Sequence, residues 1–457
     1  MARERTAIEV VSEAIERLGG ALAGTSRPDL DARFEVQRVR RVSLVDGAVT
    51  ESASAVFAAG AAAVAGEPRF FSAASNLDEL SVALADLRHR RTTSVAEREP
   101  VRDHAGLRDE PAWPVLDAVA AALQRLRNAA ADAAPAMSSY RSFYEDHWRL
   151  AWYGSSDGTS VVQAFADTSL ITTVRTRRLD ANGFSFASVA AAEPAALLQT
   201  DTAIRSAAAQ AQRLLDAPPV EPGPTTVVLD PHLTGLFAHE ALGHLCEADY
   251  LRLRPDVAKA FGPGTRVASP LLTVIDDPGR AGLRGSYRFD DEGTPAAPTT
   301  IVEAGQVMSY LHSRATAARF GVAPTGHARA QDYRFPPLVR MANTFVAPGT
   351  TPLAEMFAGV DDGLYLTRPM GGETTIDAFT FGANEVYRIR QGRVAEPVGA
   401  VLLIGNLFET LSTVDAVGTD LAFESSGGGC AKEDQVSLPV DSGGPHLRIR
   451  DCQVVPL

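Results

Sequence analysis

The amino-acid sequence predicts an α+β fold, and three patterns support this prediction. Near the N-terminus, Val11, Ile15 and Leu18 recur at steps of three and four residues, as on one face of an amphipathic helix. From residue 226 onward the chain consists mostly of short β-rich runs separated by turn signals. Strands and helices do not alternate in βαβ order, so a parallel, doubly wound sheet is not expected.

Composition and charge narrow the class of protein. The 457 residues are 45% hydrophobic and 22% charged, which is typical of a globular fold, and the length suggests about two or three domains. The net charge of −13 disfavours binding to nucleic acid or to an anionic membrane surface, because like charges repel. We therefore expect neither nucleic acid nor membrane as a partner.

The cysteine content and the lack of long apolar runs bear on location. Three cysteines in so long a chain are too few for a disulfide framework and are typical of a reducing compartment. The charged first residues are not followed by an apolar signal segment, and no apolar run approaches the roughly 20 residues that span a bilayer. These features predict a cytoplasmic protein.

A proline-rich segment predicts the domain boundary. Residues 217–224 contain four prolines, which fit neither a helix interior nor a central strand. We therefore expect an N-terminal α+β domain at residues 1–216, a linker at residues 217–226 and a strand-rich C-terminal domain at residues 227–457.

The N-terminal part is expected to begin with a helix that Gly19-Gly20 ends. Asp46-Gly47 is a hairpin signal between two strand-like runs, and Asn76 can cap a following helix that carries leucines on one face. Farther along, we expect helices at residues 113–131 and 195–215, strands around residues 148–153, 161–165 and 170–174, and a turn at Asn182-Gly183.

In the C-terminal part, helices are expected only locally. Ala304-Gly305 and Gln391-Gly392 each separate two β-rich runs and predict hairpins. The expected strands are at residues 226–229, 271–275, 300–301, 306–310, 386–390 and 401–404, and the expected helices are at residues 313–319 and 352–360.

The segment His239-Glu240-Ala241-Leu242-Gly243-His244 contains the residue types of a zinc hydrolase. Two imidazoles can bind the metal, and the neighbouring carboxylate can accept a proton from the attacking water. In the familiar H-E-x-x-H motif, positions i and i+4 differ by about 40° around a helix, so both rings face one way. Here the spacing is i+5, which would place the rings about 140° apart on a regular α-helix.

Two interpretations follow from this spacing. In the first, the two histidines are unrelated, one packed and one exposed. In the second, the helix widens into a π-type turn or ends at this point, and both rings converge on zinc. π-turns concentrate at functional sites, and Gly243 tolerates such a break. The spacing alone does not choose between the two.

A glycine run almost two hundred residues later supplies a further candidate ligand. Residues 425–435 read Ser-Ser-Gly-Gly-Gly-Cys-Ala-Lys-Glu-Asp-Gln, with Cys430 directly after three glycines. Glycines let a backbone enter a crowded site, and a thiolate is a strong zinc ligand. Cys246 and Glu247 are rivals, but Cys246 would point away from His244 on a continuing helix, and Glu247 is unusually close in sequence for a third ligand.

Together these elements resemble the TldD/PmbA family of metallopeptidases, on the TldD side. Residues 284–294, Arg-Gly-Ser-Tyr-Arg-Phe-Asp-Asp-Glu-Gly-Thr, are similar to the family's R-G-S-Y-x-x-D-D-E-G-T block. Residues 324–326, 340–344, 371–372 and 435–448 resemble it as well, so the similarity is dense from about Leu229 onward. It is thinner before that point, where residues 59–63, Ala-Gly-Ala-Ala-Ala, replace a Gly-x-Gly-x-Arg pattern typical of the family.

The resemblance implies a zinc site with His239, His244 and Cys430 as ligands and Glu240 as the general base. Two histidines and one cysteine leave a fourth position open, which is typical of catalytic zinc. The resemblance further implies hydrolysis of unfolded or small peptides, such as antitoxins and leader peptides, inside a dimer. That dimer would be a homodimer or a heterodimer with a metal-free PmbA/TldE-like subunit.

Two other functions are considered. A regulatory or binding subunit of the same fold without hydrolytic activity is the main alternative, although such a chain would be expected to lose Glu240 or Cys430. A zinc hydrolase of non-peptide amides is the other. Tyr287, Tyr310 and Tyr333 are candidates for stabilising an oxyanion, and the sequence does not choose among them.

Overall fold

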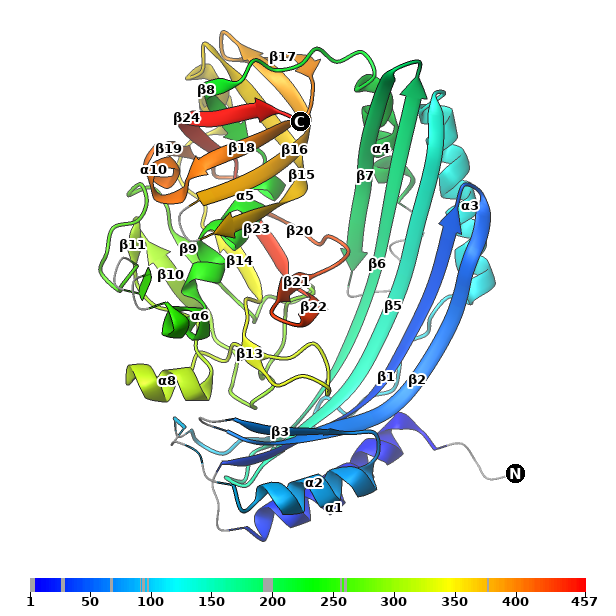
Figure 1. The fold of residues 1–457 in the computed structure, drawn as a ribbon, viewed down its shortest axis with the longest axis vertical. Helices are drawn as coiled ribbons and strands as arrows, with labels where there is room; N and C mark the ends of the chain where they lie inside the picture. Colours follow the sequence, from blue (N-terminus) through cyan, green and yellow to red (C-terminus); the bar gives the residue numbers. More distant parts are fainter. Residues whose placement is uncertain are drawn as a thin grey trace.

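The computed structural model describes residues 5–25, 29–65, 69–90, 92, 95–96, 98–191, 200–254, 257–258, 261–375 and 378–457. A long, curved and mostly antiparallel sheet stands beside a body of shorter strands and helices (Figure 1). The α+β prediction is confirmed. None of the helices in the described part of the chain combines the length and the apolar character needed to cross a bilayer.

The curved sheet has the strand order β3-β2-β1-β5-β6-β4, and β7 pairs with β6. Four of its strands are 16 to 19 residues long. Its members are β1 (Leu30–Val45), β2 (Ala48–Val64), β3 (Phe70–Ala74), β4 (Arg102–Asp103), β5 (Met137–Ser155), β6 (Ser160–Arg178) and β7 (Ala181–Ala191). The predicted hairpin is confirmed, because Asp46 and Gly47 join β1 to β2 with positive φ angles of 48° and 98°.

Four helices cover one face of this sheet, namely α1 (Ala7–Ala23), α2 (Leu77–Leu87), α3 (Leu116–Ala133) and α4 (Asp201–Arg213). Figure 1 shows α3 and α4 on the side of the sheet that faces away from the C-terminal body. Apolar side chains of the sheet and these helices form two buried clusters. The opposite face of the sheet is therefore left to face the C-terminal body.

Two local predictions were wrong. The first helix does not end at Gly19-Gly20 but continues to Ala23, because Leu18 and Leu22 are both buried against the sheet. Asn182-Gly183 lies inside β7, and the chain turns just before it. A Cβ atom on Gly183 would lie 2.0 Å from the carbonyl oxygen of Ala211 in α4, so glycine is needed here for close packing.

Other boundaries also moved. Asn76 caps α2 as predicted, accepting hydrogen bonds from the backbone amides of Asp78 and Glu79. The strands expected at residues 161–165 and 170–174 are parts of one strand, β6. Of the helix expected at residues 195–215, α4 is the regular part, and residues 195–199 lie outside the described residues.

The C-terminal body contains a sheet that closes on itself. The order is β15-β8-β24-β18-β16-β17, β15 also pairs with β16, and β19 pairs with β24. The strands are β8 (Gly223–Leu229), β15 (Asp362–Thr375), β16 (Ala378–Arg390), β17 (Arg393–Val398), β18 (Val401–Asn406), β19 (Val414–Val417) and β24 (Leu447–Pro456). Gln391-Gly392 forms the predicted hairpin between β16 and β17.

A second sheet has the order β11-β10-β9-β14-β23-β20. Its strands are β9 (Val274–Asp276), β10 (Thr299–Glu303), β11 (Gln306–Val307), β14 (Asn343–Val346), β20 (Ala422–Glu424) and β23 (Asp441–Gly444). β12 (Ala328–Arg329) pairs with β13 (Leu338–Val339), and β21 (Cys430–Lys432) pairs with β22 (Gln435–Leu438). Several predicted strands were too long, since β9 begins at Val274 and β11 ends at Val307.

Short helices complete this body: α5 (Pro231–Ala238), α6 (Ala248–Leu253), α8 (Arg314–Phe320), α9 (Leu353–Ala358) and α10 (Leu407–Ser412). α5 contacts both sheets, and the ring of Phe237 packs edge-on against Phe379 and Phe381. This packing fixes the helix that leads into the histidine motif. The division into two domains at residues 217–226 stays a prediction.

Candidate metal centre

The histidine motif lies at the end of α5, where the helix changes its geometry. The side chain of Asp230 caps α5, which runs directly into a π-helical turn, η2 (His239–Gly243), and then a short 3₁₀ turn, η3 (His244–Cys246). The backbone amide of His244 donates to the carbonyl oxygen of His239, five residues earlier. This wider turn accommodates the extra residue, so the centroids of the two rings lie 5.1 Å apart. The predicted π-type turn is confirmed, and the binding of zinc by the two rings stays a prediction.

Gly243 lets the π-turn lie against the neighbouring chain. A Cβ atom at this position would lie 2.0 Å from the sulfur of Met341. Met341 is fully buried, so the contact leaves little room for any side chain at residue 243. Packing against Met341 therefore favours glycine here, whereas the backbone angles of Gly243, φ −60° and ψ −53°, are open to any residue.

Cys430 approaches the two histidines from a separate hairpin. It is the first residue of β21, directly after Gly429, where a Cβ atom would lie 2.4 Å from the carbonyl oxygen of Leu438. At Gly427, a Cβ atom would lie 2.7 Å from the side chain of Ile171 in β6. The glycine run therefore passes closely between its own hairpin and the curved sheet.

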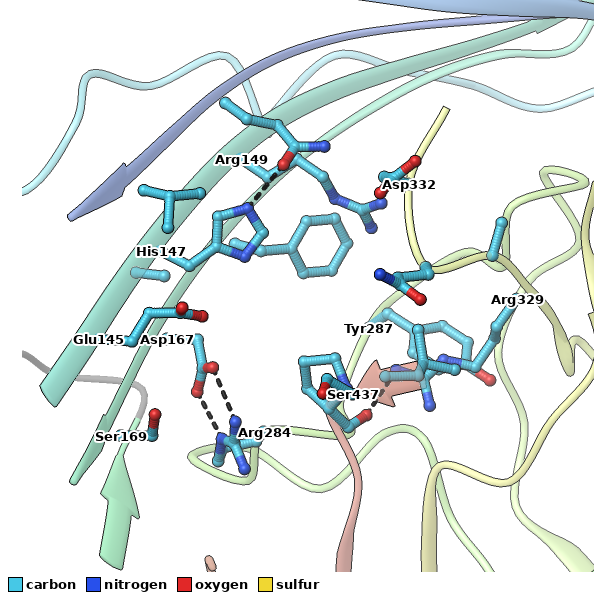
Figure 2. A pocket seen from close by; sticks show the side chains of 18 of the residues that line it. Glu145, His147, Arg149, Asp167, Ser169, Arg284, Tyr287, Arg329, Asp332 and Ser437 are labelled. Carbon is cyan, nitrogen blue, oxygen red and sulfur yellow. Dashed lines mark hydrogen bonds and ion pairs between the residues drawn. The ribbon is translucent and has the colours of Figure 1, made fainter. Parts of the chain in front are cut away.

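Arg284 holds this glycine run against the curved sheet. Its Nε and Nη2 atoms donate to the carboxylate of Asp167 in β6 at 2.5 and 2.8 Å, as Figure 2 shows. The same guanidinium donates to the carbonyl oxygens of Ser426 and Gly428. One arginine of the R-G-S-Y segment therefore joins β6 to the loop that precedes Cys430.

His239, His244 and Cys430 form a compact cluster. One ligand atom from each residue lies within 4.8 Å of the others, and the sulfur of Cys430 is 3.4 Å from Nε2 of His244. Two metal–ligand bonds of about 2.0–2.3 Å span at most about 4.5 Å, so a small side-chain shift would bring all three atoms to one ion. Nδ1 of His239 is buried without a hydrogen-bond partner among the described residues. The donor types, two imidazoles and a thiol, and the burial of His239 and Cys430 fit a zinc ion.

Charge within the cluster favours the metal-binding form of the cysteine. Burial acts to raise the pKa of Cys430, but the adjacent His239 and His244 lower it to about 5. The thiolate is the form that coordinates metal. Burial opposes protonation of His239 in turn, but the charge of Cys430 and its hydrogen bond to the ring, with the charge of Glu240, together outweigh burial and raise the pKa of that imidazole. The three side chains are thus electrostatically coupled.

Glu240 lies at the edge of the cluster. Its Oε2 atom is 3.9 Å from Nε2 of His244, and its side chain is 21% exposed, so it reaches both the cluster and solvent. Burial raises the pKa of the Glu240 carboxyl. A carboxylate with a raised pKa at this position is suited to accept and return a proton.

The two rival ligands lie outside the cluster. Cys246 is fully buried, and burial raises the pKa of its thiol well above the usual range. Glu247 instead faces the far side of His244, with Oε2 3.1 Å from Nδ1. Burial opposes its ionisation, but the charges of Lys432 and His244 outweigh this and lower the pKa of Glu247 to about 2. An ionised Glu247 accepts a hydrogen bond from the Nδ1–H group of His244. This leaves Nε2 of the same ring free to bind a metal.

The three candidate tyrosines differ in their surroundings. The hydroxyl of Tyr287 donates to the carbonyl oxygen of Gly326, and that of Tyr310 donates to Phe261. Tyr333 lines a large cavity and packs near the ring of Phe57. None of the three is assigned to an oxyanion.

A cavity of about 960 Å³ lies between the inner face of the curved sheet and the C-terminal body (Figure 2). Its sheet side carries Glu145, His147 and Arg149 from β5, and its other side carries Arg329, Asp332 and Ser437. The glycine run and β22 also line it, whereas His239, His244 and Cys430 do not. The hairpin that carries Cys430 therefore separates the cluster from the cavity.

This cavity was not predicted from the sequence, although one signal for it exists along β5. Along β5, Glu145, His147 and Arg149 alternate with the buried Asp146 and Trp148. Such alternation indicates a strand with one polar face. This polar face of β5 lines a cavity only because strands that are distant in the sequence pair with one another and lie beside it.

The fold and the site together define an α+β protein with a partly buried cluster of two histidines and one cysteine beside a carboxylate. Residues 222–456 match the family model described as PmbA/TldA metallopeptidase C-terminal domain. A metalloprotease of Synechocystis sp. is 40% identical over 314 residues, which are 68% of this chain and 67% of that protein. The chain belongs to the PmbA/TldD family of metallopeptidases.

Further relatives and structures agree. A zinc metalloprotease TldD homolog of Saccharolobus solfataricus is 36% identical over 234 residues, 51% of this chain and 52% of that protein. The matched part of the chain thus spans about half to two thirds of the length of these relatives. TldE of Thermococcus kodakarensis has the same fold, with a TM-score of 0.73 and 16% identity over 97% of this chain and 99% of that chain.

Proposed function

We propose that this chain is a zinc-dependent metallopeptidase that hydrolyses unfolded or small peptides, of the leader-peptide or antitoxin type. The convergence of His239, His244 and Cys430, with Glu240 beside them, carries the proposal. A zinc metalloprotease is also what the Saccharolobus relative is named. The prediction of zinc, of these ligands and of the role of Glu240 is part of this proposal.

In the proposed mechanism, His239, His244 and Cys430 would hold the ion through the nitrogens and the sulfur that face one another. When bound, zinc would act as a Lewis acid on the scissile carbonyl and on water. Glu240 removes a proton from the attacking water and then delivers it to the leaving amine. Its partial exposure keeps it in reach of solvent and substrate, and the side chain of His244 beside it is also partly exposed, at 29%.

The preference for unfolded peptides would follow from the surroundings of the Cys430 hairpin. Within the described residues, β21 and β22 pair only with each other, so neither has a second strand beside it, and the side chain of Gln331 holds the amide of Val436. Val436 of β22 is 53% exposed, and β22 borders the cavity. An extended peptide can add to such an edge through backbone hydrogen bonds, which tolerate many sequences. A folded substrate cannot present a free strand there.

We further propose that the active form is a dimer, either a homodimer or a heterodimer with a TldE-like subunit. The likeness in fold to TldE is one support. Another is the long edge of β2, because β3 pairs only with residues 60–64 of it. Val56 and Phe57 beside this edge are 57% and 37% exposed. Such an edge, without proline or basic residues, is open to pairing with a second chain.

The test compares one peptide sequence in two states. The zinc-loaded chain is incubated with an unstructured peptide and with the same sequence inside a folded domain, with and without a co-expressed TldE-like subunit. We expect cleavage of the unstructured peptide only. Cleavage of a small acyl-amide at a comparable kcat/KM would favour a non-peptide amidase. Zinc binding without any cleavage, even with the second subunit, would favour a regulatory role.

A further inference from the structure

Lysine is scarce in this chain, and one of the few lysines lies beside the candidate metal centre. The sequence contains 41 arginines and only two lysines. Lys259 lies outside the described residues, and Lys432 follows Cys430 by two positions on β21. A chain that uses arginine at almost every cationic position has a lysine here, which suggests that the position needs the shape of an ammonium group.

The surroundings of Lys432 explain the need for an ammonium group. Its Nζ atom lies 3.1 Å from Oε2 of Glu247, 2.5 Å from Oδ1 of Asp249 and 2.8 Å from the carbonyl oxygen of Val339. An ammonium group has three donors, and here each has one acceptor. A planar guanidinium is larger, and its donors diverge in one plane, so it cannot make the same three contacts from one point.

These contacts join two of the candidate ligands in a ring. The Oε2 atom of Glu247 contacts two groups: Nδ1 of His244 and Nζ of Lys432. Lys432 belongs to the same short strand as Cys430, and the sulfur of Cys430 is 3.4 Å from His244. The orientation of the His244 ring and the position of the Cys430 hairpin are therefore linked through one ammonium group.

The charges around this ring are balanced and removed from solvent. Glu247 is 1% exposed, and the side chains of Lys432 and Asp249 are 12% and 18% exposed. Arg340 is fully buried and donates from Nη2 to the carbonyl oxygen of Cys430 at 2.6 Å. Lys432 is the cation that contacts both Glu247 and Asp249, so its loss would leave both carboxylates, one of them fully buried, without this partner.

We propose that Lys432 is a positioning residue for the metal centre, which acts through Glu247 on His244 and through β21 on Cys430. This inference rests on the proposed zinc site, but not on the identity of the substrate. Groups that orient metal ligands from outside typically change metal affinity by about 10- to 100-fold when they are removed. Lys432 would do so for a histidine and a cysteine at once.

The test measures zinc affinity in the full chain by competition with a chromophoric chelator. Lys432→Met keeps the length of the side chain and removes the charge, and we expect zinc affinity to fall about 10- to 100-fold. Lys432→Arg keeps the charge, and we expect only partial recovery because the three contacts cannot be remade. Arg368→Met is the matched control, since Arg368 pairs with Glu385 on β16 and is 20% exposed. Its zinc affinity should equal that of the wild type.

A spectroscopic readout separates positioning from a general loss of stability. In the cobalt-substituted protein, the charge-transfer band of the metal–thiolate bond reports on Cys430. We expect this band to weaken or shift in Lys432→Met and to stay unchanged in Arg368→Met. If Lys432→Met does not fold, Lys432→Met with Asp249→Asn removes one of the two carboxylates left without Lys432, and the same decrease in affinity is expected.

The outcomes distinguish this inference from the proposed function. Folded Lys432 variants with wild-type zinc affinity and an unchanged cobalt–thiolate band would overturn the positioning role. A wild-type chain that binds zinc with the expected band but cleaves no peptide would contradict the proposed function and leave the positioning role intact.

Discussion

The candidate metal centre and the large cavity lie on two sides of one hairpin and are built in different ways. The metal centre is small and mostly buried, and close contacts lie beside it, such as that between Gly243 and Met341. The cavity measures about 960 Å³ and is lined by charged and aromatic side chains from distant strands. β22 and the glycine run belong to the cavity wall, and Cys430 lies directly beside them in the chain.

This difference indicates that the metal centre and the cavity contribute to different steps. In the metal centre, small displacements change the distances between ligand atoms, so substitutions should act on metal binding and turnover. In the cavity, side chains border open space, so substitutions should act mainly on substrate binding or on local stability. The hairpin of β21 and β22 is the element through which the two regions would influence each other.

Removing a ligand should have the largest effect. For Cys430→Ser we expect zinc affinity to fall by more than about 100-fold, since a lost ligand should cost more than a lost outer contact, and peptide cleavage to fall with it. Equilibrium dialysis against zinc buffers measures the first, and a peptide assay the second. Cys452→Ala, at a buried cysteine outside the cluster, should keep wild-type zinc affinity. Equal affinities of wild type and Cys430→Ser would contradict the ligand assignment.

Filling the space at the π-turn should have the next largest effect. The added methyl group of Gly243→Ala would overlap Met341, so we expect the free energy of unfolding to fall by about 1–3 kcal/mol, with weaker zinc binding. Gly19→Ala in α1 is the matched control, because nothing lies within 4 Å of its added methyl group. This control should be neutral or stabilise by up to about 1 kcal/mol. Urea unfolding of both variants decides the comparison, and equal stabilities would contradict the packing argument.

Weakening the contacts of Arg284, which join the glycine run to β6, should have an intermediate effect. Arg284→Lys keeps the charge but cannot hold Asp167 and the glycine run together. We expect kcat/KM for a peptide to fall about threefold to tenfold, with zinc content unchanged. Arg448→Lys loses a similar paired contact, to Asp415, away from both regions. If both variants lose activity equally, the contacts of Arg284 with Asp167 and the glycine run have no special role.

The smallest expected effect concerns the cavity wall. Burial and the nearby Arg149 lower the pKa of His147 to about 4. Because the unfolded chain binds this proton more readily, His147 contributes stability that is fully present above about pH 6.5 and is lost as the pH falls toward 4. In His147→Gln, the loss of unfolding free energy between pH 7.5 and 5 should be smaller by on the order of 1 kcal/mol. Urea unfolding at both pH values measures it, and an identical pH dependence would contradict the buried neutral imidazole.

The fold class and several turns could be predicted from sequence because they depend on local patterns. Asp46-Gly47 and Gln391-Gly392 form hairpins as their residue types indicate. The full lengths of β5 and β6 could not be predicted from apolar runs, because one face of each strand is polar and lines the cavity. Gly183 was wrongly assigned to a turn. A glycine is needed there because Ala211 of α4, 28 residues later in the sequence, packs closely against it.

For the candidate site, the sequence could name the ligands but not their support. The spacing of His239 and His244 left two interpretations open, and only the π-turn with its packing glycine decides between them. Glu247 was considered as a ligand and instead holds Nδ1 of His244. Its position three residues after that histidine was a usable signal. Lys432 could not be recognised, because its partners Glu247, Asp249 and Val339 come from other segments.

The central claim is that the cluster binds zinc and that Glu240 performs proton transfer beside it. The most direct measurement compares peptide cleavage and zinc content of the wild type and Glu240→Gln under identical conditions. We predict equal zinc content and a fall in kcat of about 100- to 10,000-fold in the variant. Cleavage by Glu240→Gln at the wild-type rate, with zinc bound in both proteins, would contradict the account.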